Sequence, residues 1–419
     1  MSFRYLVSEA LAAMRFHRRR TLVTITSLAW GVTCFVLLVS YGTGFERTLT
    51  KAFTAVGQYL VIMFEGQTSE QAGGLRAGRR VRLEYQDADT LKDSIPLIAA
   101  ISPEKMFYSI KLVRGTRESE THIRAVWPEY GVVRNMKLAA GRWITEEDHH
   151  RQHRVVVLGS EVATELFSAM PPVGEEISIN GIRFTVIGVL ATKLQIANYN
   201  RRDNQCIFIP YDTARLFGDT RYPNFIVWQP VSANVLDDAI RHVRTRLAEI
   251  HRYSSTDEKA VEILAFHKFM SIITGMTLAV QIMLGFVGAL TLGIGGVGLA
   301  NIMLASVIDR TREVGMLQAL GARRGMILWQ FFLEAALIVG AGGVVGLVLG
   351  AGAVWTIGSM PMLGPLFKDT SGQGDIHLHL SLPAVAISMG ALFLVGVIAG
   401  IVPAIHAPRL DPIEALRYE

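Results

Sequence analysis

Three histidines lie close together beside a run of acidic residues. His149, His150 and His153 follow Glu146 to Asp148, and imidazole and carboxylate groups at such spacing can hold a metal ion. The same composition is typical of a solvated loop, which is the interpretation we prefer, so no metal is assigned. No pairing of a nucleophile with a base stands out elsewhere, and no catalytic residue is expected.

A glycine-rich hexapeptide, residues 293–298, matches the dinucleotide-binding pattern G-x-G-x-x-G. That pattern binds phosphate only where it follows a strand and opens a helix, whereas residues 269–308 carry no charge at all. Small residues in membrane helices allow neighbouring backbones to approach closely, so we expect helix packing here, within or between subunits. The glycines assigned to packing are Gly293, Gly296, Gly342, Gly346, Gly350, Gly396 and Gly400.

The sequence contains no G-x-x-x-x-G-K-[ST]. This motif forms the phosphate cradle of P-loop ATPases. We therefore expect no cofactor in this chain, and any ATP-driven work would need a motor on another chain.

The composition of the chain indicates that membrane-spanning helices position the glycines described above. The 419 residues are 50% hydrophobic and 18% charged, whereas soluble chains have about 25% charged residues. An ordinary soluble enzyme is excluded, and so is a disordered chain. The apolar residues form four runs of membrane length, with spans expected at about 22–42, 272–302, 328–354 and 382–405.

Positive charge orients these spans. Eleven of the twelve Lys and Arg residues outside 46–268 lie in residues 1–21, residues 309–325 and the tail. Because positive residues in short loops stay cytoplasmic, both termini are expected there. The 223 residues of 46–268 carry 29 basic and 27 acidic residues. The net charge of +5 thus reflects topology, and no nucleic-acid partner is expected.

The predicted fold is an α-helical membrane protein with four transmembrane helices and a large mixed α/β extracytoplasmic domain between spans one and two. Residues 1–45 form an interfacial helix and the first span, and residues 269–419 form spans two to four with a tail. Residues 46–268 contain two strand–helix–strand units around a strand-rich insert. Asn180-Gly181 predicts a hairpin, and Asn234 is expected to cap a helix over residues 235–250.

The second cytoplasmic loop is the most informative segment. Val314, Leu317 and Leu320 recur at intervals of three, charges lie at both ends, and Gly321 offers a stop. These features predict a short amphipathic helix. It could lie on the membrane surface or dock into a groove of a partner, while a solvated loop is the alternative.

Residues 312–315 (Arg-Glu-Val-Gly) and 318–322 (Gln-Ala-Leu-Gly-Ala) resemble the coupling-helix signature of MacB/FtsX-like ABC transporter permeases. The tail at residues 411–417 is similar to the family's C-terminal motif. Residues 141–143 (Gly-Arg-Trp) and 172–174 (Pro-Val-Gly) resemble its periplasmic core domain. The resemblance covers nearly the whole chain, although many relatives have a basic residue where this chain has Gln318.

The resemblance implies a non-catalytic permease subunit in the cell inner membrane. Its partners would be a separate ABC ATPase that holds ATP and Mg²⁺, a second identical or related permease, membrane lipid, and a periplasmic adaptor with an outer-membrane channel. ATPase closure would be transmitted to the outer domain for efflux or extraction of a substrate (mechanotransmission). The alternative is an FtsX-like regulator that activates an outer-side partner such as a cell-wall hydrolase.

The resemblance places the coupling helix at about residues 310–322. Our hypothesis is that Arg312 and Glu313 make the decisive polar contacts with the ATPase; the alternative is that they cap the helix and pair with lipid headgroups. The residues assigned to ATPase coupling are Arg310, Arg312, Glu313, Val314, Gly315, Leu317, Ala319, Leu320, Gly321 and Ala322.

Overall fold

The chain forms two compact units in the computed structural model. The first, called the helical unit, comprises Met1–Thr48, Thr274–Leu366 and Asp375–Glu419, and the second, the α/β unit, comprises Leu49–Ile273 and Phe367–Gly374. The structure describes residues 14, 18–57, 59–72, 74–168, 170–196, 199–319, 322–363 and 372–406, without the side chains of 317, 319, 324 and 402–406. The expected interfacial helix before residue 14 and the tail motif at 411–417 lie outside the described residues.

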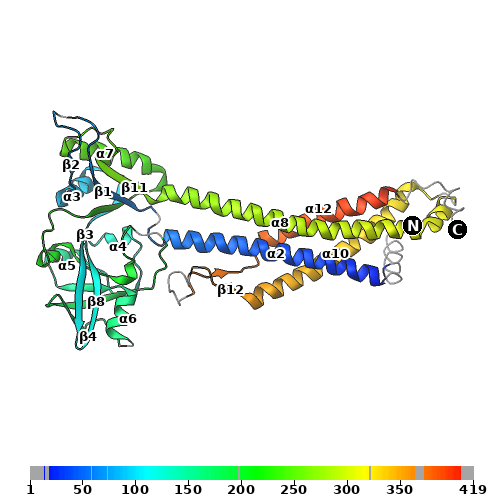
Figure 1. Cartoon of the computed structure of the whole chain (residues 1–419), viewed down its shortest axis with the longest axis horizontal. Coiled ribbons are helices and arrows are strands. Elements are labelled where there is room, and N and C mark those ends of the chain that lie inside the picture. The colour runs from blue at the N-terminus through cyan, green and yellow to red at the C-terminus, as the bar shows by residue number, and fades with distance from the viewer. Residues whose placement is uncertain are drawn as a thin grey trace. The chain divides into compact units, whose positions relative to one another are not determined.

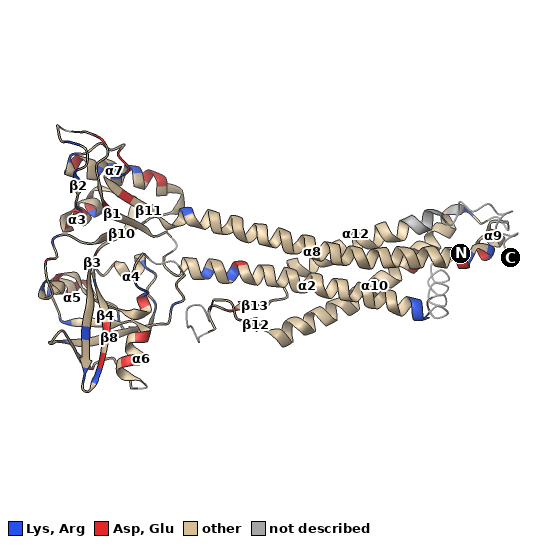
Figure 2. Cartoon of the chain, in the orientation of Figure 1, with Lys and Arg blue, Asp and Glu red and all other residues tan. Residues whose placement is uncertain are grey.

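Four helices in the described part of the chain are long and apolar enough to cross a membrane, as the sequence predicts. Their centres carry almost no charged side chains in Figure 2, which shows charge mainly at helix ends and in the α/β unit. The first two are longer than their apolar runs. The helices are α2 (Arg18–Thr54), α8 (Phe266–Asp309), α10 (Arg324–Ile357) and α12 (Leu382–His406), with the short α9 (Thr311–Ala319) after α8 and a small hairpin of β12 (Ser359–Met360) and β13 (Ile376–His377) after α10.

Glycines on α10 allow α2 to pack closely against it. A Cβ built on Gly346 would lie 2.6 Å from both the Ala29 carbonyl oxygen and the Val32 Cβ. The Thr33 hydroxyl donates a hydrogen bond of 3.1 Å to the Gly346 carbonyl, which is the kind of close contact that small residues permit in membrane helices. A Cβ built on Gly342 would lie 2.8 Å from the Leu28 side chain, and one built on Gly350 would lie 3.2 Å from the Val36 side chain, both on α2.

Of the remaining glycines assigned to packing, three lie against a neighbouring helix and one does not. Gly396 and Gly400 on α12 approach Val339 and Ala335 of α10, and Gly296 on α8 approaches Val395 of α12. Gly293 was assigned to the same role, but a Cβ built there meets nothing within 4 Å among the described residues. Gly288, which meets Phe35, and Gly343, which meets Leu392, are close contacts that the sequence prediction missed.

The first and last strands of the α/β unit build an antiparallel sheet with helices attached (Figure 1). Its order is β11-β1-β10-β3. Numbered in chain order, these four strands stand 4-1-3-2, which is the arrangement of a ferredoxin-like split βαβ fold. The elements are β1 (Val61–Gln67), α3 (Tyr85–Ser94), β3 (Ile98–Arg114), β10 (Phe225–Pro230), α7 (Leu236–His251) and β11 (Val261–Ala265), with β2 (Arg80–Val81) paired to β1.

The middle strands of the α/β unit form a closed ring of paired strands. Pairing runs from β3 through β4, β9, β6, β8 and β7 and back to the far end of β3. Strand β3 serves both sheets, and its register slips between Phe107 and Ile110, where Ser109 has φ 51°; an extra residue of this kind bends a strand. These elements are β4 (Arg117–Val126), α4 (Tyr130–Val133), β5 (Leu138–Gly141), α5 (Glu146–His150), β6 (Val155–Leu158), α6 (Ser160–Phe167), β7 (Glu176–Ile179), β8 (Ile182–Leu190) and β9 (Cys206–Pro210), with 3₁₀ turns at Asp203–Gln205, Tyr211–Leu216 and Ala233–Val235.

Two long helices are connected to two neighbouring strands. Residues 55–60 lie between the end of α2 and the start of β1, and β11 runs into α8 without an intervening residue. Strands β1 and β11 pair antiparallel, with Val61 opposite Ala265, and the Phe266 N–H donates to the Leu60 carbonyl at 2.9 Å. The ends of α2 and α8 are therefore held by one ladder of backbone hydrogen bonds, which we call the β1–β11 clamp.

Candidate functional site

The short helix α9 presents two unlike faces. Val314 is 4% exposed and belongs to the same buried cluster as Val307, Ile327 and Phe331. Arg312 and Glu313 are exposed, and Met316 is 47% exposed. The apolar side therefore packs α9 onto its own bundle, and the side that carries Arg312, Glu313 and Met316 is not covered by any of the residues that the structure describes.

Two ion pairs hold the end of α8, where the connection to α9 and α10 begins. An Arg310 guanidinium nitrogen lies 3.5 Å from a Glu334 carboxylate oxygen on α10, and both side chains are largely buried. At the end of α8, Asp309 accepts a 2.8 Å hydrogen bond from Arg20 of α2. These contacts tie the two residues just before α9 to α10 and to α2.

The structure places the residues assigned to ATPase coupling on both sides of α9. Val314 and Gly315 are buried, because the apolar side of this helix packs inward. Arg310 positions the helix through Glu334, and Ala322 is half-buried beyond its end. Leu320 and Gly321, and the side chains of Leu317 and Ala319, lie outside the described residues.

The histidines of the α5 region do not converge. His149 is buried, with its Nε2 3.7 Å from Asp212 and 3.5 Å from the Tyr85 hydroxyl. His150 contacts Glu146 on the surface, and His153 contacts Asp148 at 3.1 Å. Across the described residues, no group of three or more His, Cys, Asp or Glu side chains has the geometry to hold a metal.

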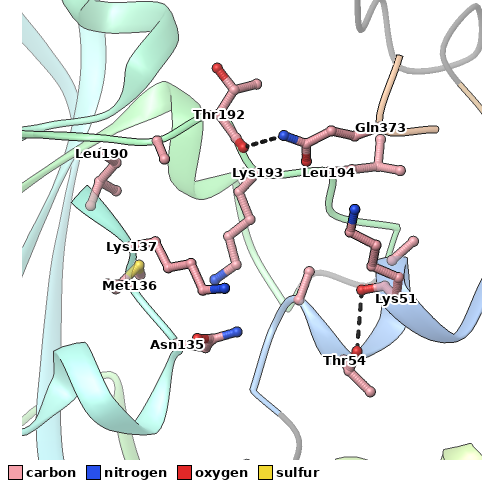
Figure 3. Close-up of a pocket in the computed structure, with 13 residues that line it drawn as sticks. Lys51, Thr54, Asn135, Met136, Lys137, Leu190, Thr192, Lys193, Leu194 and Gln373 are labelled. Carbon is pink, nitrogen blue, oxygen red and sulfur yellow. Dashed lines mark hydrogen bonds between the residues drawn. The ribbon is translucent and has the colours of Figure 1, made fainter. Parts of the chain in front are cut away.

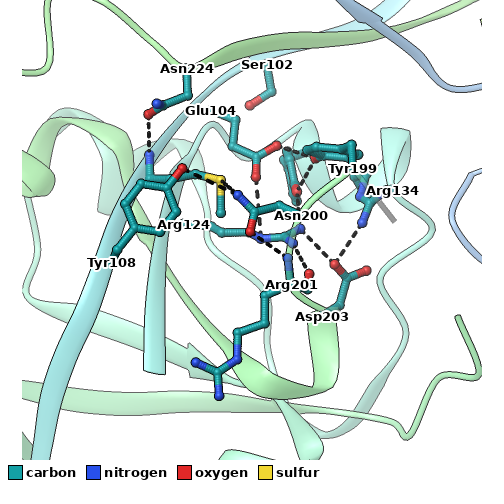
Figure 4. A network of polar contacts seen from close by, with 12 residues as sticks. Ser102, Glu104, Tyr108, Arg124, Arg134, Tyr199, Asn200, Arg201, Asp203 and Asn224 are labelled. Atoms are coloured by element: carbon teal, nitrogen blue, oxygen red, sulfur yellow. Dashed lines mark hydrogen bonds and ion pairs between the residues drawn. The ribbon is translucent and has the colours of Figure 1, made fainter. Parts of the chain in front are cut away.

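The α/β unit contains a buried network of charged side chains centred on Asp203 (Figure 4). Asp203 is fully buried and accepts hydrogen bonds of 2.8 Å from both Arg124 and Arg134. Its second oxygen accepts from Gln195 at 2.9 Å and from Lys193 at 3.1 Å. Burial alone would raise the pKa of Asp203, but the positive charges of Arg134, Lys193 and Arg124 hold it well below its usual range.

Glu104 completes the network from strand β3. It lies 3.4 Å from the Arg124 Nε and accepts a short hydrogen bond from the Tyr199 hydroxyl. Tyr199 in turn contacts the Tyr130 hydroxyl at 3.1 Å. The network therefore fastens the loop of residues 191–205 onto strands β3 and β4. Sequence reasoning missed it, and its one signal is an arginine at position 124 between apolar neighbours of a strand.

Two family models match the chain. Residues 21–245, more than half of it, match the MacB-like periplasmic core domain, and residues 285–412 match the FtsX-like permease C-terminal domain. The chain belongs to the MacB/FtsX family of ABC transporter permeases. The second match includes α9, so the free face of that helix lies in the part of the chain that the MacB/FtsX family shares.

Curated relatives of this MacB/FtsX permease extend over nearly all of it. It is 32% identical to the macrolide export ATP-binding/permease protein MacB of Bdellovibrio bacteriovorus, with 98% of this chain and 61% of that protein covered. It is 28% identical to the uncharacterized ABC transporter permease YknZ of Bacillus subtilis, with 99% and 98% covered. The chain thus spans about three fifths of that MacB relative and nearly the full length of YknZ.

A solved structure, the periplasmic region of MacB from Actinobacillus actinomycetemcomitans, shares 22% identity with a TM-score of 0.41, covering 54% of this chain and 98% of that one.

Proposed function

We propose that this protein is the permease subunit of a MacB-type ABC transporter. It would couple ATP hydrolysis on a separate ATPase to a conformational change of the α/β unit outside the membrane, for efflux or extraction of a substrate. The observation that carries this proposal is the polar face of α9, which is exposed among the described residues while the opposite face is packed into the bundle.

The position of α9 supports docking of a partner. A helix that carries force must be fixed on one side and bound on the other, and α9 is fixed by Val314 and by the Arg310–Glu334 ion pair. The free face carries one cation, one anion and one methionine, and methionine adapts readily to a partner surface. We assign the ATPase contact to Arg312, Glu313 and Met316, and it follows that the α9 end of the bundle faces the cytoplasm.

The β1–β11 clamp supports transmission at the other end. Backbone hydrogen bonds join β1, which follows α2 after residues 55–60, to β11, which continues into α8. A shift of α8 relative to α2 would therefore strain this ladder. Within the membrane helices that the structure describes, Glu334 is the main ionisable residue. A polar translocation path usually carries buried charge, so the scarcity of charge supports work on the outer side.

The proposal is tested by co-purification of the permease with its ATPase. The double variant Glu313→Arg with Met316→Asp changes two exposed side chains, so the bundle should fold normally while position 313 reverses its charge and position 316 gains a negative charge. We expect the ATPase to be lost from the purified complex. The matched control is Arg19→Glu, which also reverses an exposed charge, on α2, and should keep the ATPase bound. Retention of the ATPase by the α9 variant would contradict the proposal.

A further inference from the structure

A cavity of about 410 Å³ opens beside the last turn of α2, entirely within the α/β unit (Figure 3). Its size is in the range of small-molecule sites. Three lysines line it and no acidic residue does. The lining comes from Lys51 to Ala55 of α2 and its end, from the segment 135–137 after α4, from residues 190–194 after β8, and from Gln373.

Two of the lysines lack a counter-charge. Among the described residues, neither Lys51 nor Lys137 has an ion pair, and both side chains are exposed at the cavity rim. In Figure 3 the Lys137 and Lys193 side chains and the Asn135 amide point toward the same part of the cavity. Positive charges gathered without an acid favour the binding of an anion.

Lys193 forms the buried part of the cavity. Its ammonium donates to the Arg134 carbonyl at 2.6 Å and to Asp203 at 3.1 Å, and an ammonium group has three donors, so one remains for a ligand. Burial lowers the pKa of Lys193 to about 8, although the Asp203 carboxylate opposes this shift. The group is still mainly charged at neutral pH, and a bound anion would stabilise that charge.

The position of Lys51 along α2 indicates which anion is at hand. The charge-free part of α2 ends at Phe45, and six further helical residues place Lys51 about 9 Å beyond it. The headgroup layer of a bilayer begins where the hydrocarbon ends and is about 5–8 Å deep on each side. If α2 crosses the membrane, as the proposed function requires, the Lys51 backbone lies just outside the headgroup layer, and its long side chain can reach back to the lipid phosphates.

We propose that this lysine-lined cavity binds a phosphate group, carried either by a lipid headgroup or by a small soluble anion. Lys51 and Lys137 bind the phosphate oxygens at the rim, and Lys193 supplies a donor from below. Because Lys193 also binds Asp203, an occupied cavity is connected to the buried network that fastens the loop of residues 191–205.

The test uses the full chain in a neutral detergent and measures the binding of fluorescent short-chain phosphatidylglycerol. The variant Lys51→Gln with Lys137→Gln removes both rim charges, and it should weaken binding about tenfold or more, since hydrogen bonds to charged groups are the strong ones. The matched control is Lys111→Gln with Lys259→Gln, which removes two exposed charges outside the cavity and should change binding less than about twofold.

Inorganic phosphate distinguishes the two sources. If millimolar phosphate displaces the lipid from the wild type, the site accepts a free anion; if it does not, while the lipid still depends on the rim lysines, the ligand is a headgroup. Equal binding by the rim variant and the control, or no binding by the wild type, would overturn the proposal. Thermal midpoints should match, because both rim side chains are exposed. Co-purification of the ATPase is unaffected by these variants, so failure here is separate from failure of the proposed function.

Discussion

Asp203 joins segments that are far apart in the sequence. Its partners Arg124, Arg134, Lys193 and Gln195 come from a strand, a helix end and a loop. Such a buried ion network contributes little net stability compared with apolar packing, but removing one member leaves uncompensated charge in a dry environment. The cost of breaking it is therefore large.

The variant Asp203→Asn should lower the stability of the α/β unit by about 3–5 kcal/mol, because the Arg124 and Arg134 guanidinium groups remain buried without their carboxylate. Denaturation of the full chain in detergent, followed by tryptophan fluorescence, measures this loss. Asp219→Asn is the control, since Asp219 pairs with Arg221 at the surface, and it should leave the transition nearly unchanged.

The same residue predicts a response to acid. The folded pKa of Asp203 lies below its unfolded value of about 3.9, so its stabilising contribution is complete above that value and is lost as pH falls below it. The denaturation midpoint of the wild type should therefore decline more steeply between about pH 4 and pH 2 than that of Asp203→Asn. Parallel pH curves for the two proteins would refute this role.

Sequence reasoning could not find this network. Arg124 is visible as a charged residue in an apolar strand, but its partners Glu104, Arg134 and Asp203 belong to other segments, and only the folded sheet brings them together. The polar face of α9 was easier to predict from the sequence, because the regular spacing of a helix of nine residues determines which side chains share a face. Even so, the pattern did not show which of its two faces packs inward.

Among the helices and strands, short sequence motifs predicted correctly the turn that depends only on neighbouring residues. The Asn180-Gly181 hairpin is confirmed, with Ile179 paired to Ile182 and both turn residues at positive φ. The Asn234 cap is wrong, because a 3₁₀ turn over Ala233–Val235 precedes α7 and no side chain caps it. Helix α2 outlasts its apolar run, since Glu46, Arg47 and Lys51 end the hydrophobic pattern without breaking the helix.

The packing of α10 against α2 gives a prediction at this scale. Gly346→Val should destabilise the helical unit by about 1–3 kcal/mol, the cost of overpacking, because the new Cβ meets Ala29 and Val32 at 2.6 Å. Gly352→Val on the same helix meets nothing within 4 Å and serves as the matched control. Thermal unfolding in detergent compares them, and equal midpoints would show that the α2 contact does not matter.

For the whole molecule, the β1–β11 clamp is the direct covalent and hydrogen-bonded route between the long helices and the sheet. Insertion of Gly-Ser-Gly between Ala265 and Phe266 interrupts this route on the α8 side while leaving α9 untouched. We expect ATPase binding and basal ATP hydrolysis to persist. The nucleotide-dependent change in distance between spin labels on two α/β units should disappear.

The control for this experiment is the same insertion after Gly74, where the chain is exposed and a Cβ would meet nothing within 4 Å. It adds the same flexible residues to the α/β unit away from the clamp, and the distance change should survive. If the insertion at Ala265 also preserves the change, motion does not pass through the β1–β11 pair.

The clamp has a further consequence for how such proteins can diversify. The two points where the chain enters and leaves the sheet are neighbouring strands, which lie about 5 Å apart. A domain whose ends meet in this way can be exchanged for another, or shortened to a simple turn, without changing the distance between the helices that carry it. The helical unit can therefore carry different outer domains. A chimaera that has a relative's α/β unit between Thr54 and Phe266 should still bind the ATPase of the protein that supplies the helices.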